Sequence, residues 1–281
     1  MVGSKRGTLV LNTITYAVAI FFALFCILPL LWLILTSLKP ETEIVTSLGV
    51  KYIPDELTLQ NYVDIWRQSD FPTLLKNSLI TTLITIALCL ITGTLAAYAF
   101  SRYQFPGRRQ MLLGYLVVRM FPAVMQIIPL FIIMRMLGLL DTSFGLALAY
   151  TSFLLPLFVW IMKGFFDALP DDLEDAARIE GCTRLGAMVR VVMPLVRNGV
   201  MATTVFVAIA AWNEFLFALM LTTSSGSRTW PVGLQLMIGE FQLPWGLLAA
   251  GGVISIIPVV ILFALVQQSM VRGLTEGAVK G

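Results

Sequence analysis

The sequence contains no histidine among its 281 residues, and it has neither a His-Glu-x-x-His nor a Gly-x-Ser-x-Gly motif. Without histidine the chain lacks the usual general base and the commonest metal ligand, so we expect no catalytic site and no metal site. The three cysteines, Cys26, Cys89 and Cys182, are too scattered for a disulfide framework or a zinc-binding spacing. No Gly-x-x-x-x-Gly-Lys-Ser/Thr loop occurs either, so this chain cannot be an ATP-hydrolysing component.

Charged residues are also scarce. They make up 12% of the chain, against roughly 25% in a soluble domain, while 58% of residues are hydrophobic and the mean hydropathy is +0.88. Because about 20 apolar residues span a bilayer, the sequence predicts an all-α, polytopic membrane protein with one domain over residues 1–281. Its partner by composition is membrane lipid, and the net charge of +3 is too small to indicate nucleic acid. The six predicted spans lie at about 14–38, 78–100, 111–134, 143–162, 199–221 and 246–266.

The first span is predicted to be retained rather than cleaved as a signal peptide. Its apolar run from Ala17 to Leu35 has 19 residues, which is longer than the apolar region of a signal peptide, roughly 7–15 residues. We expect Pro29 to kink this span. Orientation follows from lysine and arginine, which favour the inner side of a membrane. Twelve of them fall in the segments on the side of the N-terminus and six on the other. We therefore expect both termini to be cytoplasmic.

The longest charged interruption in the C-terminal half covers residues 168–194. Pro170 suits the first turn of a helix, the acids after it suit the positive end of the helix dipole, and Gly181 supplies a stop. The pattern predicts a helix over 170–181 and a second short helix over 183–192. Ala176 and Ala177 are small enough for another protein to approach closely. Such a helix is either a docking element or a solvated loop helix.

Two predicted spans carry polar residues. In the third, Arg119, Pro122, Gln126 and Pro129 have a spacing that places them on one helical face. A buried arginine costs from about 3 to over 10 kcal/mol unless it meets water, a carbonyl or an acid, so this face lines a cavity or packs inside the bundle. The fifth span carries polar residues that either bond neighbouring helices or line a substrate path. The candidate path residues are Arg119, Gln126, Thr203, Asn213 and Glu214.

Two segments on the outer side are longer than simple connections. Residues 39–72 include an amphipathic stretch with Leu59, Tyr62, Val63 and Trp66 at helical spacing, which is either an interfacial helix or a docking surface. Residues 222–244 form either a plain connection or a functional loop.

The charged segment resembles the EAA signature of binding-protein-dependent ABC importer permeases, which reads Glu-Ala-Ala, three residues, Gly, nine residues, Ile-x-Leu-Pro. Here the matching positions are Asp175-Ala176-Ala177, Gly181 and Val191-Val192-Met193-Pro194. Asp175 is one methylene shorter than the family's glutamate, and the adjacent Glu174 is expected to be able to take its place. The Trp212-Asn213-Glu214-Phe215 run and the C-terminal residues 271–281 are similar to the carbohydrate branch, as in the second permease of the maltose transporter.

This resemblance implies a type I importer permease fold in the inner membrane of a bacterium or archaeon, without enzymatic activity or cofactor of its own. The implied cargo is a sugar, either a di- or oligosaccharide or a sugar derivative. The implied partners are a second, unlike permease, two ATPase subunits that hold ATP and magnesium, and an extracytoplasmic solute-binding protein. The alternative function is an ion-coupled secondary transporter, in which an acid such as Glu214 would bind the coupling ion, although no inverted repeat is visible.

The resemblance also assigns residues to three contacts. The residues implied to couple to the ATPase are Pro170, Leu173, Glu174, Asp175, Ala176, Ala177, Glu180, Gly181 and Pro194. The loop implied to enter the binding protein contains Ser224, Ser225, Gly226, Ser227, Arg228 and Trp230. The tail implied to reach the ATPase contains Gly277, Ala278, Val279, Lys280 and Gly281.

Overall fold

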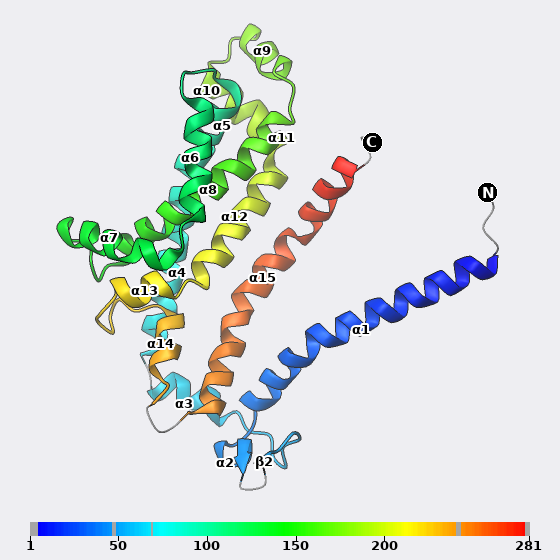
Figure 1. The fold of residues 1–281 in the computed structure, drawn as a ribbon, viewed down its shortest axis with the longest axis vertical. Coiled ribbons are helices and arrows are strands. Elements are labelled where there is room, and N and C mark those ends of the chain that lie inside the picture. The colour runs from blue at the N-terminus through cyan, green and yellow to red at the C-terminus, as the bar shows by residue number, and fades with distance from the viewer. Residues whose placement is uncertain (1–4, 47–48, 69, 240–242, 279–281) are drawn as a thin grey trace. The chain divides into compact units, whose positions relative to one another are not determined.

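The fold is built almost entirely from helices that form two units (Figure 1). This computed structural model describes residues 5–46, 49–68, 70–239 and 243–278. The first unit comprises residues 1–69 and 237–256, and the second comprises residues 70–236 and 257–281. The long helix α15 contributes its first part to the first unit and its remainder to the second.

The first unit is organised around Lys39, whose side chain is buried although it carries a charge. Its Nζ donates hydrogen bonds to the carbonyls of Lys51 (2.6 Å) and Tyr52 (2.9 Å) and lies 4.5 Å from the centre of the Trp32 ring. Burial lowers the pKa of Lys39, although the nearby Glu43 opposes that shift. The elements of this unit are α1 (Lys5–Ser37), α2 (Glu41–Ile44), the antiparallel strands β1 (Val45–Thr46) and β2 (Gly49–Val50), α3 (Gln60–Gln68) and the start of α15 (Trp245–Ala278).

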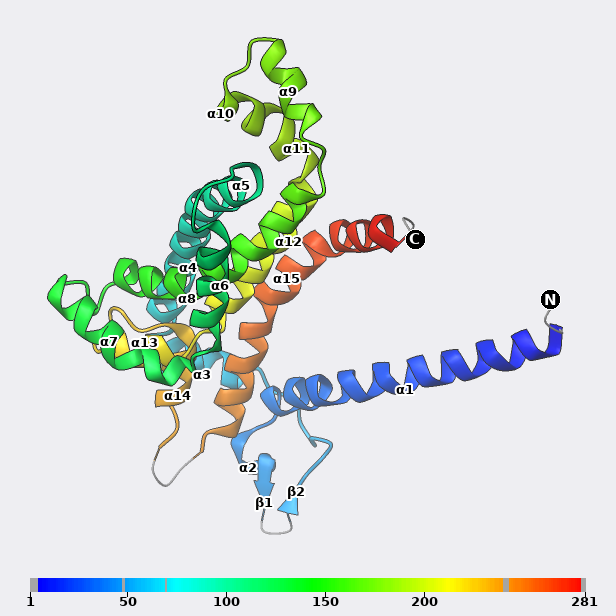
Figure 2. The same ribbon diagram turned by 45° about the horizontal axis from the view of Figure 1, so that its top comes forward.

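The second unit contains the remaining helices, with α8 at its centre (Figure 2). This helix packs against α4, α5 and α12, and over half of its apolar stretch is buried. Helix α4 continues through a π-helical turn, η1, into α5, so residues 71–102 form one span. The elements are α4 (Phe71–Leu88), η1 (Cys89–Gly93), α5 (Thr94–Arg102), α6 (Arg108–Met120), α7 (Ala123–Met136), α8 (Ser143–Asp167), α9 (Asp172–Ile179), α10 (Arg184–Ala187), η2 (Met188–Val192), α11 (Met193–Leu195), α12 (Arg197–Trp212), α13 (Leu216–Leu221) and α14 (Trp230–Leu236).

The nearly all-helical fold confirms the predicted fold class. Among the described residues, four helices are long and apolar enough to cross a membrane, at 11–37, 71–102, 143–167 and 245–267. Two further pairs pass the same test but are sharply bent, by 104° within 108–136 and by 81° within 184–212. The chain therefore has up to six spans if each bent pair counts as one.

The third predicted span is not one straight helix. The prediction that its polar residues share one helical face is therefore wrong. Helix α6 ends at Met120 and α7 begins at Ala123, with Phe121 extended at ψ 131° and Pro122 at the break. The cause is the proline ring, which disfavours helical conformation in the residue before it. Arg119 and Gln126 consequently lie on different helices.

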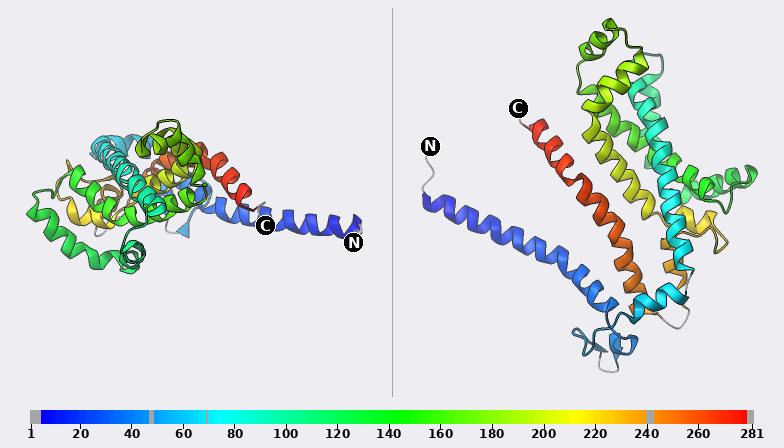
Figure 3. Two further views of the ribbon diagram at one scale, coloured as in Figure 1. Left: turned by 90° about the horizontal axis from the view of Figure 1, so that it is seen from above. Right: turned by 180° about the vertical axis from the view of Figure 1, so that it is seen from behind.

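The fifth predicted span is also broken. Helix α12 ends at Trp212, and Asn213, Glu214 and Phe215 separate it from α13. Thr203 and Glu214 therefore do not share the face of one continuous helix. Helix α13 instead lies beside α7, as the views in Figures 1 and 3 show.

The close contact between η1 and α8 depends on Gly93. A Cβ atom at this position would lie 2.4 Å from Cδ1 of Phe158, and Phe158 is itself almost fully buried, so it has little room to move.

We expect Gly93→Ala to lower the stability of the second unit by about 1–3 kcal/mol, the usual cost of overpacking a core. Thermal unfolding of the purified chain in detergent measures the effect. Gly114→Ala in α6 is the matched control, because a Cβ there meets nothing within 4 Å and alanine favours a helix. Equal unfolding temperatures for the two variants would contradict this account of the packing.

Candidate functional site

The charged segment forms a short helix, α9, that projects beyond α5 and α8 at one end of the second unit (Figures 1 and 2). Its C-terminal stop is as predicted, because Gly181 has φ +94° and Cys182 N donates to the Ala177 carbonyl at 3.0 Å. Its start is later than predicted. Asp171 is the N-cap and Asp172 is the first helical residue, so Pro170 precedes the helix instead of lying in its first turn.

The second short helix is present as well. It begins at Arg184, where the Thr183 side chain accepts a hydrogen bond from Gly186 N at 3.1 Å, and it continues through η2 into α11. Pro194 lies in α11 and is exposed.

The outward face of α9 combines acids with small and apolar residues. Ala176 is exposed, Leu173 is 39% exposed and Ile179 is 89% exposed. Asp175 is exposed and accepts a hydrogen bond from Arg178 at 2.9 Å, while Ala177 is buried. Asp172 and Glu180 are exposed too. This face therefore remains available to another protein.

Glu174 points the opposite way, into the chain. Its carboxylate accepts hydrogen bonds from the Tyr98 hydroxyl and from Arg102 Nε, both at 2.5 Å, and the residue is 8% exposed. Arg102 also pairs with Asp171 at 2.7 Å and donates to the Leu169 carbonyl at 3.1 Å. The expectation that Glu174 could replace Asp175 in an outward contact is therefore wrong, because its charge is already paired within the chain.

Sequence reasoning missed Tyr98 and Arg102. They are four residues apart, so they share one face of α5. That spacing was visible in the sequence, but nothing in it identified the partner on α9.

The loop from Thr222 to Trp230 lies beside the first half of α4. Side chains from two parts of the chain hold it. Asp141, which precedes α8, accepts hydrogen bonds from Thr223 N (2.7 Å), Ser224 N (3.0 Å) and the Ser227 hydroxyl. No pattern in the sequence predicted this contact.

Helix α4 holds the same loop from the other side. Asn77 Nδ2 donates to the carbonyls of Gly226 (2.8 Å) and Arg228 (3.0 Å), and Trp230 N donates to Ser78 Oγ at 2.7 Å. Trp230 is fully buried, with its ring edge-on to Phe71 at 4.6 Å. Trp230 therefore anchors the loop and does not offer a contact to a partner, whereas Ser224, Ser225 and Gly226 are exposed.

The five candidate path residues do not form one constellation. Arg119 Nη1 donates to the Phe153 carbonyl at 3.2 Å, and its guanidinium lies 4.5 Å from the centre of the Phe153 ring. Gln126 Nε2 donates to the carbonyls of Val118 (3.4 Å) and Phe121 (3.3 Å) at the break before α7, where Val118 also accepts a hydrogen bond from Phe121 N at 3.3 Å. Gln126 thus bonds the backbone at the bend between α6 and α7, and Arg119 joins the end of α6 to α8.

The polar residues near the second break have a comparable arrangement. The Glu214 carboxylate accepts hydrogen bonds from Phe217 N (2.9 Å) and Ala218 N (3.1 Å), so it caps α13, and Asn213 Nδ2 donates to the Ile209 carbonyl at 2.9 Å. Thr203 is buried and donates to the Gly199 carbonyl at 2.7 Å. Asn213 and Thr203 thus bond backbone one turn earlier in sequence, whereas the backbone carbonyl of Glu214 also accepts a hydrogen bond from the Tyr150 hydroxyl of α8 at 3.5 Å.

The predicted ATPase-contacting tail is described only in part. Gly277 and Ala278 are the last residues of α15, and Val279, Lys280 and Gly281 lie outside the described residues.

A bundle of membrane-spanning helices that carries an exposed, charged helix beyond one end has the architecture of a membrane transport subunit. A family model described as "Binding-protein-dependent transport system inner membrane component" matches residues 89–276, more than half of the chain. The chain belongs to this family.

Curated relatives match over nearly the whole chain. The sulfoquinovosyl glycerol transport system permease protein SmoH of Agrobacterium fabrum is 40% identical, over 90% of this chain and 88% of the relative. The trehalose transport system permease protein SugB of Mycobacterium tuberculosis is 38% identical, over 99% and 100%. The trehalose/maltose transport system permease protein MalG of Thermococcus litoralis is 39% identical, over 94% and 95%.

Solved structures share the fold. One chain of a bacterial ABC transporter involved in the import of the acidic polysaccharide alginate has a TM-score of 0.81 at 24% identity, over 95% of this chain and 99% of that chain. A chain from the alginate transporter in complex with an alginate pentasaccharide-bound periplasmic protein has a TM-score of 0.64 at 13% identity, over 94% and 93%.

The pKa of Asp141 gives a test of the loop contacts. Burial would raise the pKa of this carboxyl, but hydrogen bonds from Ser227, Ser224 and Thr223 outweigh burial and hold the pKa well below its usual range. Because the folded-state pKa is depressed, the stabilisation is complete above the unfolded pKa of about 3.9 and is lost only as pH falls through the folded value.

We expect Asp141→Asn to speed hydrogen exchange at the amides of Thr223 and Ser224 about tenfold near neutral pH, because hydrogen bonds to a charged acceptor contribute about 1.5–3 kcal/mol. Asparagine tolerates the positive φ of 60° at this position, so the change isolates the charge. The control is Asp55→Asn, which removes an exposed carboxylate paired with Lys51 in the first unit. Unchanged exchange in the Asp141 variant would show that the charge does not hold the loop.

Proposed function

We propose that this chain is the transmembrane permease subunit of an ATP-driven importer that passes a sugar into the cell by alternating access. The single observation that carries the proposal is α9, an exposed helix whose inward acid, Glu174, is tied to a membrane-spanning helix. Family membership supports the class of transporter. The relatives' names support a sugar as cargo, since they are permeases for trehalose, maltose and sulfoquinovosyl glycerol.

The proposed assembly has three kinds of protein partner. A second, unlike permease completes the pathway, two ATPase subunits bind ATP and magnesium, and an extracytoplasmic binding protein delivers the sugar. Helix α9 docks on the ATPase through the face that carries Leu173, Asp175 and Ala176. The end of the second unit that carries α9 is then cytoplasmic. This agrees with the larger number of lysine and arginine residues on that side.

The contacts of the span over residues 71–102 suggest how movement crosses the membrane. At one end, Tyr98 and Arg102 bind Glu174 of α9, and at the other end Asn77 and Ser78 bind the loop that Trp230 anchors. About 20 residues separate the two groups, which corresponds to roughly 30 Å of helix. When ATP binding closes the ATPases, displacement of α9 tilts this helix and thereby shifts the outer loop.

The loop's outward part then has a role in sugar release. Ser224, Ser225 and Gly226 are exposed although backbone groups of Ser224 and Gly226 hold the loop in place, so they are the part that contacts the binding protein. No observation favours an ion-coupled secondary transporter, because both oxygens of Glu214 accept hydrogen bonds from α13. Sugar uptake into vesicles with an ion gradient and no ATP is the direct test of that alternative.

We expect Glu174→Gln to uncouple transport. The change leaves Arg102 without its buried counter-charge, so α9 loosens from α5, and sugar uptake should fall at least tenfold while the ATPases still hydrolyse ATP. Uptake and ATP hydrolysis are measured together in proteoliposomes that contain the complete transporter.

The matched control is Asp172→Asn, which removes an exposed acid from the same helix and should leave both rates within about twofold, as expected for surface charge. Gly181→Leu is a second test, because leucine is strained at φ +94° and should displace the end of α9. Normal coupling in both Glu174→Gln and Gly181→Leu would overturn the proposed role of α9.

A further inference from the structure

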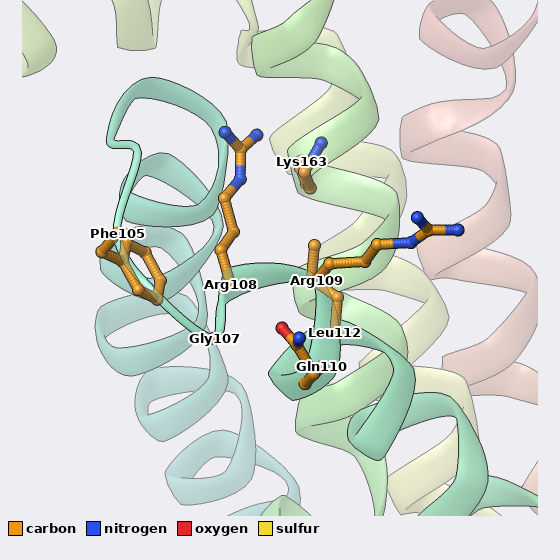
Figure 4. Close-up of a pocket in the computed structure, with 7 residues that line it drawn as sticks. All are labelled: Phe105, Gly107, Arg108, Arg109, Gln110, Leu112 and Lys163. Carbon is orange, nitrogen blue, oxygen red and sulfur yellow. The ribbon is translucent and has the colours of Figure 1, made fainter.

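A basic pocket lies between the turn after α5 and the helix α8, apart from the contacts described above (Figure 4). Its volume is about 480 Å³. The side chains that line it include Phe105, Arg108, Arg109, Gln110, Leu112 and Lys163. All of them belong to the second unit, at the end where α8 leads into α9.

The positive charge in this pocket is concentrated at the N-terminus of α6, where the helix dipole disfavours it. Arg108 and Arg109 are the first two residues of α6, whose first turn contains no acid, and its N-cap Gly107 provides no side-chain hydrogen bond. The N-terminus of a helix carries partial positive charge, so two adjacent arginines there are unfavourable unless an anion is present. The N-terminus of a helix also presents backbone N–H groups that suit a phosphate oxygen, and here Arg108 N already donates to the Phe105 carbonyl at 3.3 Å.

The chain neutralises this cluster only in part. Lys163 pairs with Asp167, which also accepts a hydrogen bond from the Ser101 hydroxyl at 2.7 Å. Arg108 reaches only the Ser101 carbonyl, at 3.5 Å, and the ion pairs of the described residues include none for Arg109. Lys163 and Arg108 thus share one carboxylate, that of Asp167, and positive charge remains for a ligand.

The surface below the cations is apolar. Over the next three turns α6 exposes Met111, Leu113, Val117 and Val118, each with between 47% and 58% of its surface accessible. A small anion such as free phosphate would make no favourable contact with this apolar surface. A phospholipid fits both parts, because its phosphate is anionic and its acyl chains are apolar.

We propose that this pocket binds the phosphate headgroup of an anionic phospholipid, whose acyl chain lies along the exposed face of α6. Arg108 and Arg109 bind the phosphate together with the first-turn N–H groups of α6, and Lys163 contributes charge from α8. Basic pockets between membrane-spanning helices are known to hold such headgroups. Bound lipid would relieve the repulsion at the start of α6 and hold α6 against α8.

The test compares phosphatidylglycerol with phosphatidylcholine. The full chain is reconstituted in nanodiscs that contain an equimolar mixture of the two, and spin-labelled versions of each lipid report their relative retention at the protein. We expect the wild-type chain to prefer phosphatidylglycerol, and Arg108→Gln with Arg109→Gln to reduce that preference about tenfold. The control pair Arg190→Gln and Arg197→Gln removes two exposed arginines outside the pocket and should keep the preference.

Two further arms make the outcome decisive. Arg108→Lys with Arg109→Lys keeps the charge and should retain most of the preference, which separates loss of charge from loss of folding. Added inorganic phosphate should not displace the labelled lipid. The proposal is overturned if the wild-type chain shows no preference, if the glutamine pair keeps it, or if inorganic phosphate competes as well as lipid does.

Discussion

The buried charge of Glu174 is the constraint on which the arrangement of α9 and the segment before it depends. A carboxylate removed from water needs partners, and here the Tyr98 hydroxyl and the Arg102 guanidinium supply them at 2.5 Å. Arg102 in turn binds Asp171 and the Leu169 carbonyl, so one guanidinium fixes the start of α9 and the segment that leads into it. Separating these groups would leave buried charges unpaired, which costs about 3–5 kcal/mol in typical cases. Helix α9 is short, and its attachment to α5 is therefore what allows it to act as an extension of a membrane span.

The two breaks in the spans follow the same physical rule at smaller scale. Backbone groups inside a membrane need hydrogen bonds, and a broken helix frees several of them. Gln126 bonds two carbonyls at the break before α7, and Glu214 bonds two N–H groups at the start of α13. Polar residues that look like parts of a pathway in the sequence are thus needed to make the bends possible. The bends matter because they bring α13 and α7 together beside the loop that Asp141 holds.

These cases show which features the sequence predicts and which it does not. Composition predicted spans at 78–100 and 143–162, which the structure extends to 71–102 and 143–167, and Gly181 predicted the end of α9, because both depend on local properties of the chain. The direction of the bend at Pro122 and the inward orientation of Glu174 depend on neighbours 30 to 80 residues away in sequence, such as Phe153 and Tyr98. Periodicity along one segment carries no information about those neighbours. For the same reason Trp230 could be identified as part of a loop but not as its buried anchor.

The short turn between α5 and α6 connects the residue that holds α9 with the basic pocket. Arg102, which holds α9, is the last residue of α5, and Arg108, which lines the basic pocket, is the first residue of α6. Tyr103 lies between them, and the guanidinium of Arg184, at the start of α10, is 5.3 Å from the centre of its ring. A displacement of α9 therefore acts on the same turn that leads into the basic pocket. An anionic lipid that binds the start of α6 would hold one side of this turn in place. Movement of α9 would then displace the span over residues 71–102 instead of deforming the turn.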